Sequence, residues 1–157
     1  MNKVYLLDFR LSPMSITTKQ IIKKQPIGIA PNKSIREAAS LMAKENIGLL
    51  VILDGNKVIG VVSERDVMKA VASGANLDDP VISIASKRVI TINEDENIYK
   101  AAELMHGNNV RHLVVMGRDG SLRGVISIRD VVGETVRLRT LAESTVPNQE
   151  EPSPHTD

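Results

Sequence analysis

The chain of 157 residues carries two copies of one sequence pattern. Residues 27–46 match residues 90–109 at a spacing of 63, and residues 60–66 match residues 124–130 at a spacing of 64. The identical pairs include Ile27/Ile90, Ile35/Ile98, Ala38/Ala101, Leu41/Leu104, Met42/Met105, Asn46/Asn109, Gly60/Gly124, Ser63/Ser127 and Asp66/Asp130. A unit this short cannot bury its own sheet face, so the two copies are predicted to pack against each other.

Each copy indicates a strand, a helix, two further strands and a second helix. The first helix of each copy has apolar residues at positions i, i+3, i+4 and i+7, which is typical of one buried helical face. Ser34 with Glu37 has the capping-box pattern, and Asn97 is the matching cap in the second copy. Asp54-Gly55-Asn56 and residues 117–120 predict hairpins. The predicted strands are 27–30, 49–53, 57–62, 89–92, 113–116 and 122–126, and the predicted helices are 34–45, 64–72, 97–107 and 129–138.

The predicted fold is of the α/β (α+β) class, with two βαββα repeats packed with pseudo-twofold symmetry into one module. Residues 16–24 and 79–87 are candidates for short helices that lead into the first strands. The final residues are rich in proline and charge, which indicates disorder. The expected division is an N-terminal segment at 1–15, repeats at 16–76 and 77–140, and a disordered tail at 141–157.

Composition excludes several classes of function. The net charge of +1 gives no electrostatic reason to expect nucleic acid as a partner. Tyr5, Phe9 and Tyr99 are the only aromatic residues, too few for a base-stacking surface. Absence of cysteine rules out disulfides and thiolate chemistry. No apolar run is long enough to span a bilayer and the N-terminus lacks a signal-peptide pattern, so we expect a cytoplasmic protein without a membrane partner.

The junctions before the second helix of each copy carry the most specific motif. Gly60-Val61-Val62-Ser63-Glu64-Arg65-Asp66 and Gly124-Val125-Ile126-Ser127-Ile128-Arg129-Asp130 share the order glycine, apolar, any residue, serine, any two residues, aspartate. This pattern, twice on one chain, resembles CBS (cystathionine β-synthase) domains, whose tandem pair is called a Bateman module. The resemblance implies a regulatory cleft for AMP, ADP, ATP or an S-adenosyl compound. It also implies a homodimer, a partner effector protein, no required cofactor and no catalysis.

The residues of the junction themselves suit a nucleotide. Unpaired N–H groups at a helix start suit phosphate, and the serine hydroxyl adds a donor. An aspartate carboxylate accepts hydrogen bonds from both hydroxyls of a ribose. The plain alternative is that Ser63 with Asp66, and Ser127 with Asp130, only cap their helices.

The resemblance implies that each site joins the junction of one repeat to the first strand and the start of the second strand of the other. Arginines are then expected at phosphate, and isoleucine or valine against adenine. One site comprises Ser63, Arg65, Asp66, Val110, Arg111 and the segment 85–90, which ends at Ile90; the other comprises Ser127, Arg129, Asp130, Ile47, Gly48 and the segment 22–27, which ends at Ile27.

The two sites are expected to differ. Arg111 in one is matched by Gly48 in the other, so the Asp66 site is predicted to bind AMP-like ligands more tightly. Strand alternation points His112 to the face opposite Arg111, as a packed or interfacial residue. The pairs Lys23-Lys24 and Lys87-Arg88 are interpreted mainly as solvated charge flanking the strands, with a contribution of positive charge to either cleft as the alternative.

Two other functions stay open. The first is a structural or interaction module with an empty cleft. The second is a nucleic-acid-binding regulator that uses those basic pairs, which the near-neutral charge disfavours. An enzyme is not expected, because the sequence has no nucleophile-elbow, P-loop or dinucleotide motif, and its histidines lack metal-ligand spacing.

Overall fold

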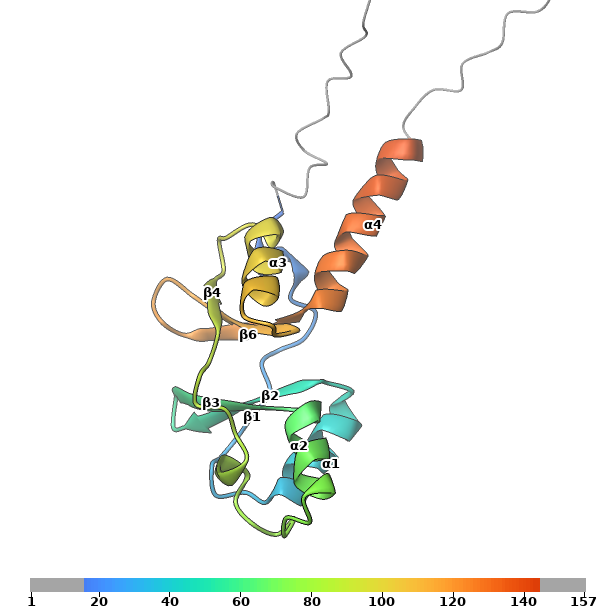
Figure 1. The fold of residues 1–157 in the computed structure, drawn as a ribbon. Coiled ribbons are helices and arrows are strands. Elements are labelled where there is room, and N and C mark those ends of the chain that lie inside the picture. Colours follow the sequence, from blue (N-terminus) through green and yellow to red (C-terminus); the bar gives the residue numbers. More distant parts are fainter. Residues whose placement is uncertain (1–15, 145–157) are drawn as a thin grey trace, which may run out of the picture.

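The computed structural model describes residues 16–144 and confirms the mixed α/β fold of two repeats (Figure 1). The first repeat consists of β1 (Gly28–Ile29), α1 (Ile35–Glu45), β2 (Leu49–Asp54), β3 (Lys57–Ser63) and α2 (Glu64–Ala72). The second consists of β4 (Thr91–Asn93), α3 (Ile98–Gly107), β5 (His112–Met116), β6 (Leu122–Ser127) and α4 (Ile128–Ser144). The 3-10 turns η3 (Thr18–Ile21) and η4 (Val81–Ser83) precede them.

Two sequence-based expectations need correction. Residues 16–24 and 79–87, expected as short helices, contain only these single 3-10 turns. Residues 141–144, assigned to a disordered tail, are helical, because α4 continues to Ser144. The N-terminal segment and the remainder of the tail lie outside the described residues.

Each repeat forms a three-stranded sheet. In the first sheet β1 runs parallel to β2 and β2 antiparallel to β3; β4, β5 and β6 repeat this topology. The helices lie on the outer sides, so that the two sheets face each other across the middle of the molecule (Figure 1). Both sheets have a register irregularity at matched places, Ile52/Leu53 and Val115/Met116. The repeat in sequence is therefore also a repeat in backbone structure.

The matched polar residues hold the helix ends. Ser34 and Glu37 form the predicted capping box of α1, and the Asn97 side chain accepts a hydrogen bond from the Lys100 amide. Asn46 and Asn109, which follow α1 and α3, both have a φ of 52°. Asparagine tolerates this left-handed conformation better than most residues, which gives the matched asparagines a structural reason.

Each sheet buries one face against its own helices. The core of the first repeat contains Leu50, Ile52 and Val62 with Ala38 and Met42 of α1. The core of the second contains the matched set of Leu113, Val115, Ile126, Ala101 and Met105. Val51 and Val114 alternate with these strand residues and are also buried, which places them on the faces where the sheets meet.

The segments that lead into each repeat pack against the other repeat. Ile21 of η3 belongs to the core cluster of the second repeat, and Val81 of η4 to that of the first. Thr18 and Lys19 donate backbone hydrogen bonds to the carbonyls of Glu96 and Glu94. At the corresponding place in the first repeat, the backbone amides of Val81 and Ile82 donate to the carbonyls of Lys33 and Pro31. The boundary at residue 76 therefore separates the two sequence repeats, but each structural unit also includes the segment that precedes the other repeat.

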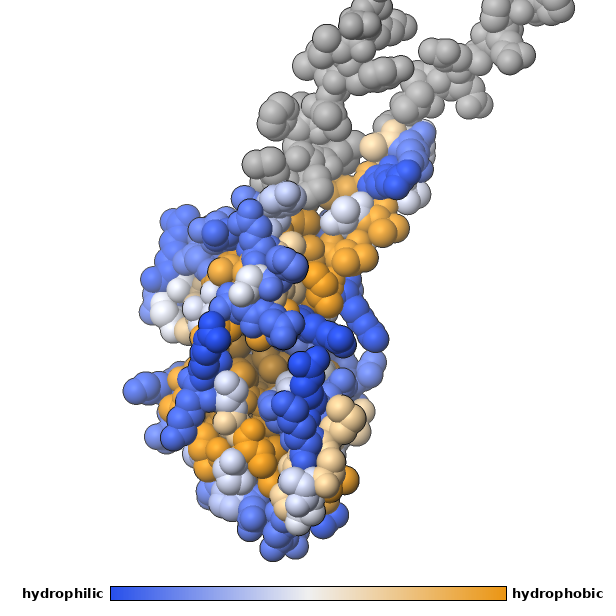
Figure 2. Space-filling view, viewed as in Figure 1, coloured by the Kyte–Doolittle hydropathy of each residue, from blue (hydrophilic) through white to orange (hydrophobic). Residues whose placement is uncertain are grey.

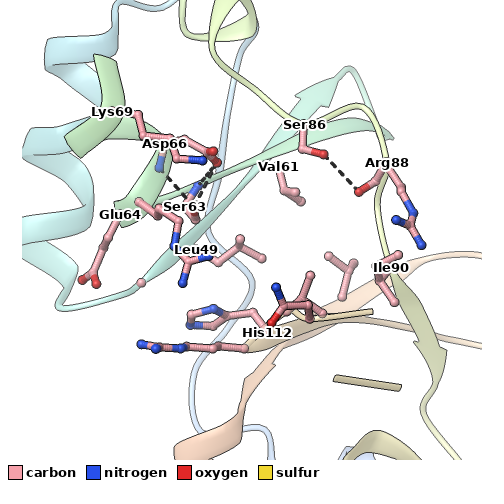
Figure 3. A pocket seen from close by; sticks show the side chains of 16 residues that line it. Leu49, Val61, Ser63, Glu64, Asp66, Lys69, Ser86, Arg88, Ile90 and His112 are labelled. Atoms are coloured by element: carbon pink, nitrogen blue, oxygen red, sulfur yellow. Dashed lines mark hydrogen bonds between the residues drawn. The ribbon is translucent and has the colours of Figure 1, made fainter. Parts of the chain in front are cut away.

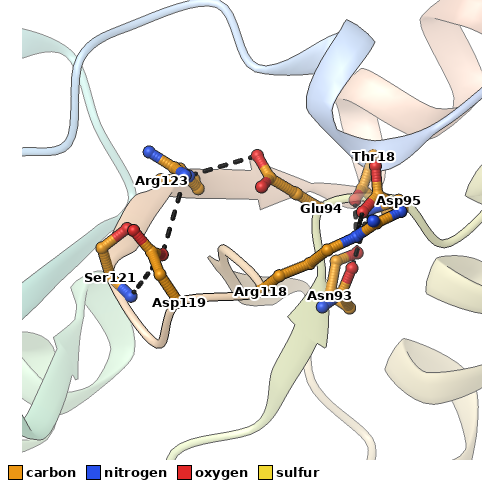
Figure 4. A network of polar contacts seen from close by, with 8 residues as sticks. All are labelled: Thr18, Asn93, Glu94, Asp95, Arg118, Asp119, Ser121 and Arg123. Atoms are coloured by element: carbon orange, nitrogen blue, oxygen red, sulfur yellow. Dashed lines mark hydrogen bonds and ion pairs between the residues drawn. The ribbon is translucent and has the colours of Figure 1, made fainter.

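Side chains reinforce the first of these attachments. Thr18 is fully buried, and its hydroxyl donates to the Asn93 carbonyl at 2.8 Å. Around it lie the ion pairs Arg118–Asp95 and Arg123–Glu94, at 2.6 and 3.2 Å (Figure 4). η3 is thus fixed to the turn that precedes α3.

Candidate functional site

A cavity of about 310 Å³ lies where the two repeats meet (Figure 3). Its floor is apolar and includes Leu49, Val61 and Val114 from strands of both sheets. It brings together Ser63, Arg65, Asp66, Val110 and Arg111 as expected, and from the segment 85–90 it includes Ser86, Arg88 and Ile90. Two of the three elements predicted to supply this site belong to the second repeat, so the cavity is formed only when both repeats are packed.

Ser63 and Asp66 form a capping box at the start of α2, which the sequence analysis gave as the alternative to a ligand-binding role. Asp66 Oδ2 accepts from the Ser63 amide at 2.8 Å and from the Ser63 hydroxyl at 2.9 Å, and Ser63 Oγ accepts from the Asp66 amide at 3.3 Å. Within residues 16–144, Asp66 Oδ1 has no hydrogen-bond or ion-pair partner. A carboxylate has about four acceptor positions, so this one caps α2 and keeps an oxygen for another donor.

Positive side chains dominate the polar part of the cavity. Arg65 and Arg111, which the sequence analysis named, are joined by Lys69 and Arg88. The carboxylates on the lining are those of Glu64 and Asp66. Four cations against two anions favour an anionic ligand.

Lys69 was missed as a site residue, and Arg88, although within the segment expected at the first site, was not assigned a ligand role of its own. Lys69 follows Asp66 by three positions on α2, and this helical spacing would have placed both side chains on one face. Arg88 was interpreted as solvated, whereas its Nη2 donates to the Asn108 side chain at 2.7 Å beside the cavity. No local pattern distinguishes such an arginine from a surface one.

The expectation for the face occupied by His112 was wrong. His112 lines the cavity together with Arg111, because β5 begins at His112 and the alternation of a strand does not extend back to Arg111. The imidazole lies against Gly48 of the first repeat. Burial lowers the pKa of His112, and the carboxylates of Glu64 and Asp130 oppose this while Arg111 adds to it. The side chain is therefore neutral at neutral pH.

The second predicted site differs in structure from the first. Asp130 Oδ2 accepts from the Ser127 amide and hydroxyl at 2.8 and 3.0 Å, as in the first copy. Its Oδ1, however, pairs with Lys23 Nζ at 3.2 Å. Ile27 and Ile47 pack against the core of the first repeat. Gly48, expected in this second site, lines the cavity at Asp66 instead, whereas Ser127, Arg129 and Asp130 do not.

A shallower depression adjoins the cavity and shares Arg65, Asn109, Val110 and Arg111 with it. It adds His106 and the apolar residues Ala102, Met105 and Ile128. Its lining contains no carboxylate. A ligand held in the cavity thus has space to extend past the two arginines.

Two other kinds of feature are absent from the described part of the chain. Among residues 16–144, no group of three or more histidine, aspartate or glutamate side chains is arranged to hold a metal ion. In the same range, no helix has the length and apolar character needed to cross a membrane.

Comparison with known proteins agrees with this architecture. The family model described as "CBS domain" matches residues 19–73 and 81–136. An uncharacterized 17.7 kDa protein of Acidianus ambivalens is 36% identical over 129 residues, which cover 82% of this chain and 78% of that protein.

Two similar solved structures are complexes with adenosine compounds. The CBS domain protein PAE2072 from Pyrobaculum aerophilum, complexed with AMP, has a TM-score of 0.74 and 38% identity, covering 82% of this chain and 99% of that one. The CBS domain pair of protein MJ0100, in complex with 5′-methylthioadenosine and S-adenosyl-L-methionine, has a TM-score of 0.69 and 28% identity, covering 82% and 98%.

Proposed function

The chain belongs to the CBS-domain family as a tandem pair, and on that premise we propose that it is a non-catalytic sensor that binds an adenine nucleotide or S-adenosyl compound between its repeats. The observation that carries this proposal is the cavity at Asp66, which has four cations on its lining and a carboxylate oxygen without a partner among residues 16–144. AMP in PAE2072, and 5′-methylthioadenosine with S-adenosyl-L-methionine in MJ0100, indicate the ligand class.

Each part of such a ligand has a matching part of the cavity. The base packs against Val110 and Ile90, which are apolar and partly buried. The ribose hydroxyls donate to Asp66 Oδ1, which is free to accept them. The phosphate lies near the N-terminus of α2, where Arg65 adds charge-assisted hydrogen bonds and the start of the helix favours an anion. Further phosphates of ADP or ATP extend into the depression beside His106.

The cavity at Asp66 is proposed to be the stronger of the two sites. The repeat matches Arg111 with Gly48, Arg88 with Gln25 and Lys69 with Gly133. The second site therefore lacks three of the four cations that line the first. A phosphate bound there would have fewer charged donors.

A ligand series tests the proposal. AMP, ADP, ATP and S-adenosylmethionine are each added at saturating concentration, and the melting temperature is measured. At 100 times the dissociation constant, binding stabilises the folded state by about 2.7 kcal/mol, which gives a clear shift. 2′-Deoxy-AMP is expected to bind about tenfold more weakly than AMP, because Asp66 loses a hydroxyl donor.

The rival functions predict different outcomes for the same protein. If none of these compounds shifts the melting temperature, the module is structural and the proposal fails. A regulator of nucleic acid would instead bind DNA or RNA with a steep salt dependence. Equal affinities for AMP and 2′-deoxy-AMP would remove Asp66 from the ribose.

The outer helices support a homodimer. Met68 and Val71 of α2 and Val132 and Val136 of α4 are each more than half exposed. Figure 2 shows apolar residues continuing along α4. An apolar face shared by the two matched helices suits an isologous contact with a second copy, in which the same surface is used twice.

Val132→Glu is expected to convert the dimer to a monomer, because a carboxylate would be buried without a partner at the contact. Sedimentation velocity measures the change. Tyr99→Glu is the matched control, since Tyr99 is similarly exposed but lies on α3. If Val132→Glu leaves the dimer intact, or Tyr99→Glu disrupts it equally, α2 and α4 do not form the contact.

Occupancy is proposed to be read by a partner effector protein. A ligand shifts a conformational equilibrium only through its different affinity for the two states. Closure of the repeats around a ligand changes the relative position of α2 and α4, which are attached directly to the Ser–Asp junctions. The cytoplasmic location stays a prediction from the sequence.

A further inference from the structure

The cavity at Asp66 and the predicted second site at Asp130, called here the second cleft, differ in the residues that lead into the first strands. At matched positions of the repeat, Ile22 stands where the other copy has Ala85, and Lys23 stands where it has Ser86. Ala85 and Ser86 precede the strand that borders the cavity at Asp66, and Ser86 lines that cavity. Ile22 and Lys23 border the second cleft at Asp130.

Ile22 fills space over the glycine of the second junction. A Cβ atom placed on Gly124 would lie 2.8 Å from Ile22 Cγ2 and 3.3 Å from its Cδ1. At the matched Gly60, the nearest atoms are the backbone oxygen of Ser86 at 3.1 Å and the Ala85 Cβ at 3.6 Å. A branched side chain therefore covers the second junction, whereas backbone and a methyl group border the first.

The backbone differs in the same way. Val61 and Ser86 exchange two hydrogen bonds, with N···O distances of 3.0 and 2.9 Å. This bridge holds the Ser86 segment flat along β3 beside the cavity. Among residues 16–144, no such bridge joins the matched pair Val125 and Lys23.

Lys23 occupies the carboxylate oxygen that a ribose would need. Asp130 Oδ1 pairs with Lys23 Nζ at 3.2 Å, and Oδ2 is used by Ser127. The Lys23 side chain is 72% exposed, so this ion pair is weak by itself. The packed Ile22 side chain blocks the space over Gly124, and Lys23 occupies the Asp130 oxygen that would accept from a ribose.

We propose that Ile22 and Lys23 close the second cleft, so that each chain binds one ligand, at Asp66. This inference rests on the proposed function of the first cleft. Ile22 and Lys23, which precede the first strand, would then determine which cleft binds the ligand. Occupancy of one cleft only makes the liganded module asymmetric although its fold is nearly symmetric.

Exchange of the two residue pairs between the clefts tests the proposal, with AMP as the probe and isothermal titration calorimetry as the measurement. The wild-type chain is expected to bind one AMP. Ile22→Ala/Lys23→Ser gives the second cleft the residues of the first and is expected to add a second, weaker binding event. Ala85→Ile/Ser86→Lys is expected to weaken binding at the first cleft at least about tenfold.

Lys24→Ser is the control, because Lys24 Nζ donates to the Glu45 carbonyl and does not touch Asp130. It is expected to leave one AMP per chain. Two AMP per wild-type chain, or one AMP after Ile22→Ala/Lys23→Ser in a protein that still melts cooperatively, would overturn the inference. If that variant does not fold, Lys23→Ser alone is titrated instead, because it frees Asp130 Oδ1, and unchanged binding of one AMP would overturn the inference. Absence of AMP binding by the wild type is instead a failure of the proposed function.

Discussion

Asp66→Asn is expected to weaken AMP binding by about 10- to 100-fold, while Asp130→Asn leaves the affinity nearly unchanged. The reason is the unequal use of the two carboxylates. In the described part of the chain Asp66 Oδ1 has no partner and can accept from ribose hydroxyls, whereas Asp130 Oδ1 already pairs with Lys23. A hydrogen bond to a charged acceptor is worth about 1.5–3 kcal/mol, and asparagine removes the charge.

The two variants control each other. Both aspartates cap their helices through Oδ2, with nearly the same distances to the preceding serine. Each substitution therefore disturbs one capping box, and the loss of stability, about 1 kcal/mol or less, should be similar. Calorimetric titration with AMP and the melting temperature of the free protein separate binding from stability. Should Asp130→Asn be the more damaging to binding, the assignment of the stronger site to Asp66 is wrong.

Ile21→Ala is expected to lower the free energy of unfolding by about 2–5 kcal/mol, a large share of the stability of a domain this size. Ile21 is 6% exposed and belongs to the core cluster that contains Leu113, Val115 and Ile126. Urea unfolding measures the loss. Truncation of a buried isoleucine removes its burial and leaves a cavity, because the surroundings relax only in part.

Hydrogen exchange locates the effect. Under conditions that allow partial opening, Ile21→Ala is expected to reduce protection mostly in residues 91–126, although residue 21 precedes the first repeat. Val81→Ala is the mirror variant and should reduce protection mostly in residues 28–63. If each substitution instead reduced protection in the repeat that follows it in sequence, the packing of Ile21 on the second repeat and of Val81 on the first would be refuted.

The sequence was sufficient for features that depend on local patterns. Helical periodicity, capping residues and Asp-Gly turns placed α1, α2, α3 and both hairpins within a residue or two of their observed bounds. The repeated Ser–Asp junctions indicated the elements that would form the site. Their assembly across the two repeats was implied by the family resemblance, since no periodicity states which repeat a strand will face.

Other features depend on tertiary contacts that a sequence window does not contain. Residues 16–24 form one 3-10 turn in place of the expected helix, and hydrogen bonds hold this turn to another turn more than 70 positions away. α4 continues to Ser144 with ion pairs such as Arg139–Glu143 on its surface, where the composition of the tail had suggested disorder. The role of Lys23 depends on Asp130, which is remote in sequence.

The contact between Gly48 and His112 makes it difficult for single substitutions to give both clefts the same affinity. Position 48 is where the second cleft would need an arginine to equal the first. A side chain there would begin 3.0 Å from two atoms of the His112 ring, so the imidazole must give way. A lineage that acquired Gly48→Arg alone would disturb the wall of the working cleft, and compensation at residue 112 would have to come with it. The contact between Gly48 and His112 thus favours a state in which only one of the two duplicated sites binds the ligand and the other serves packing.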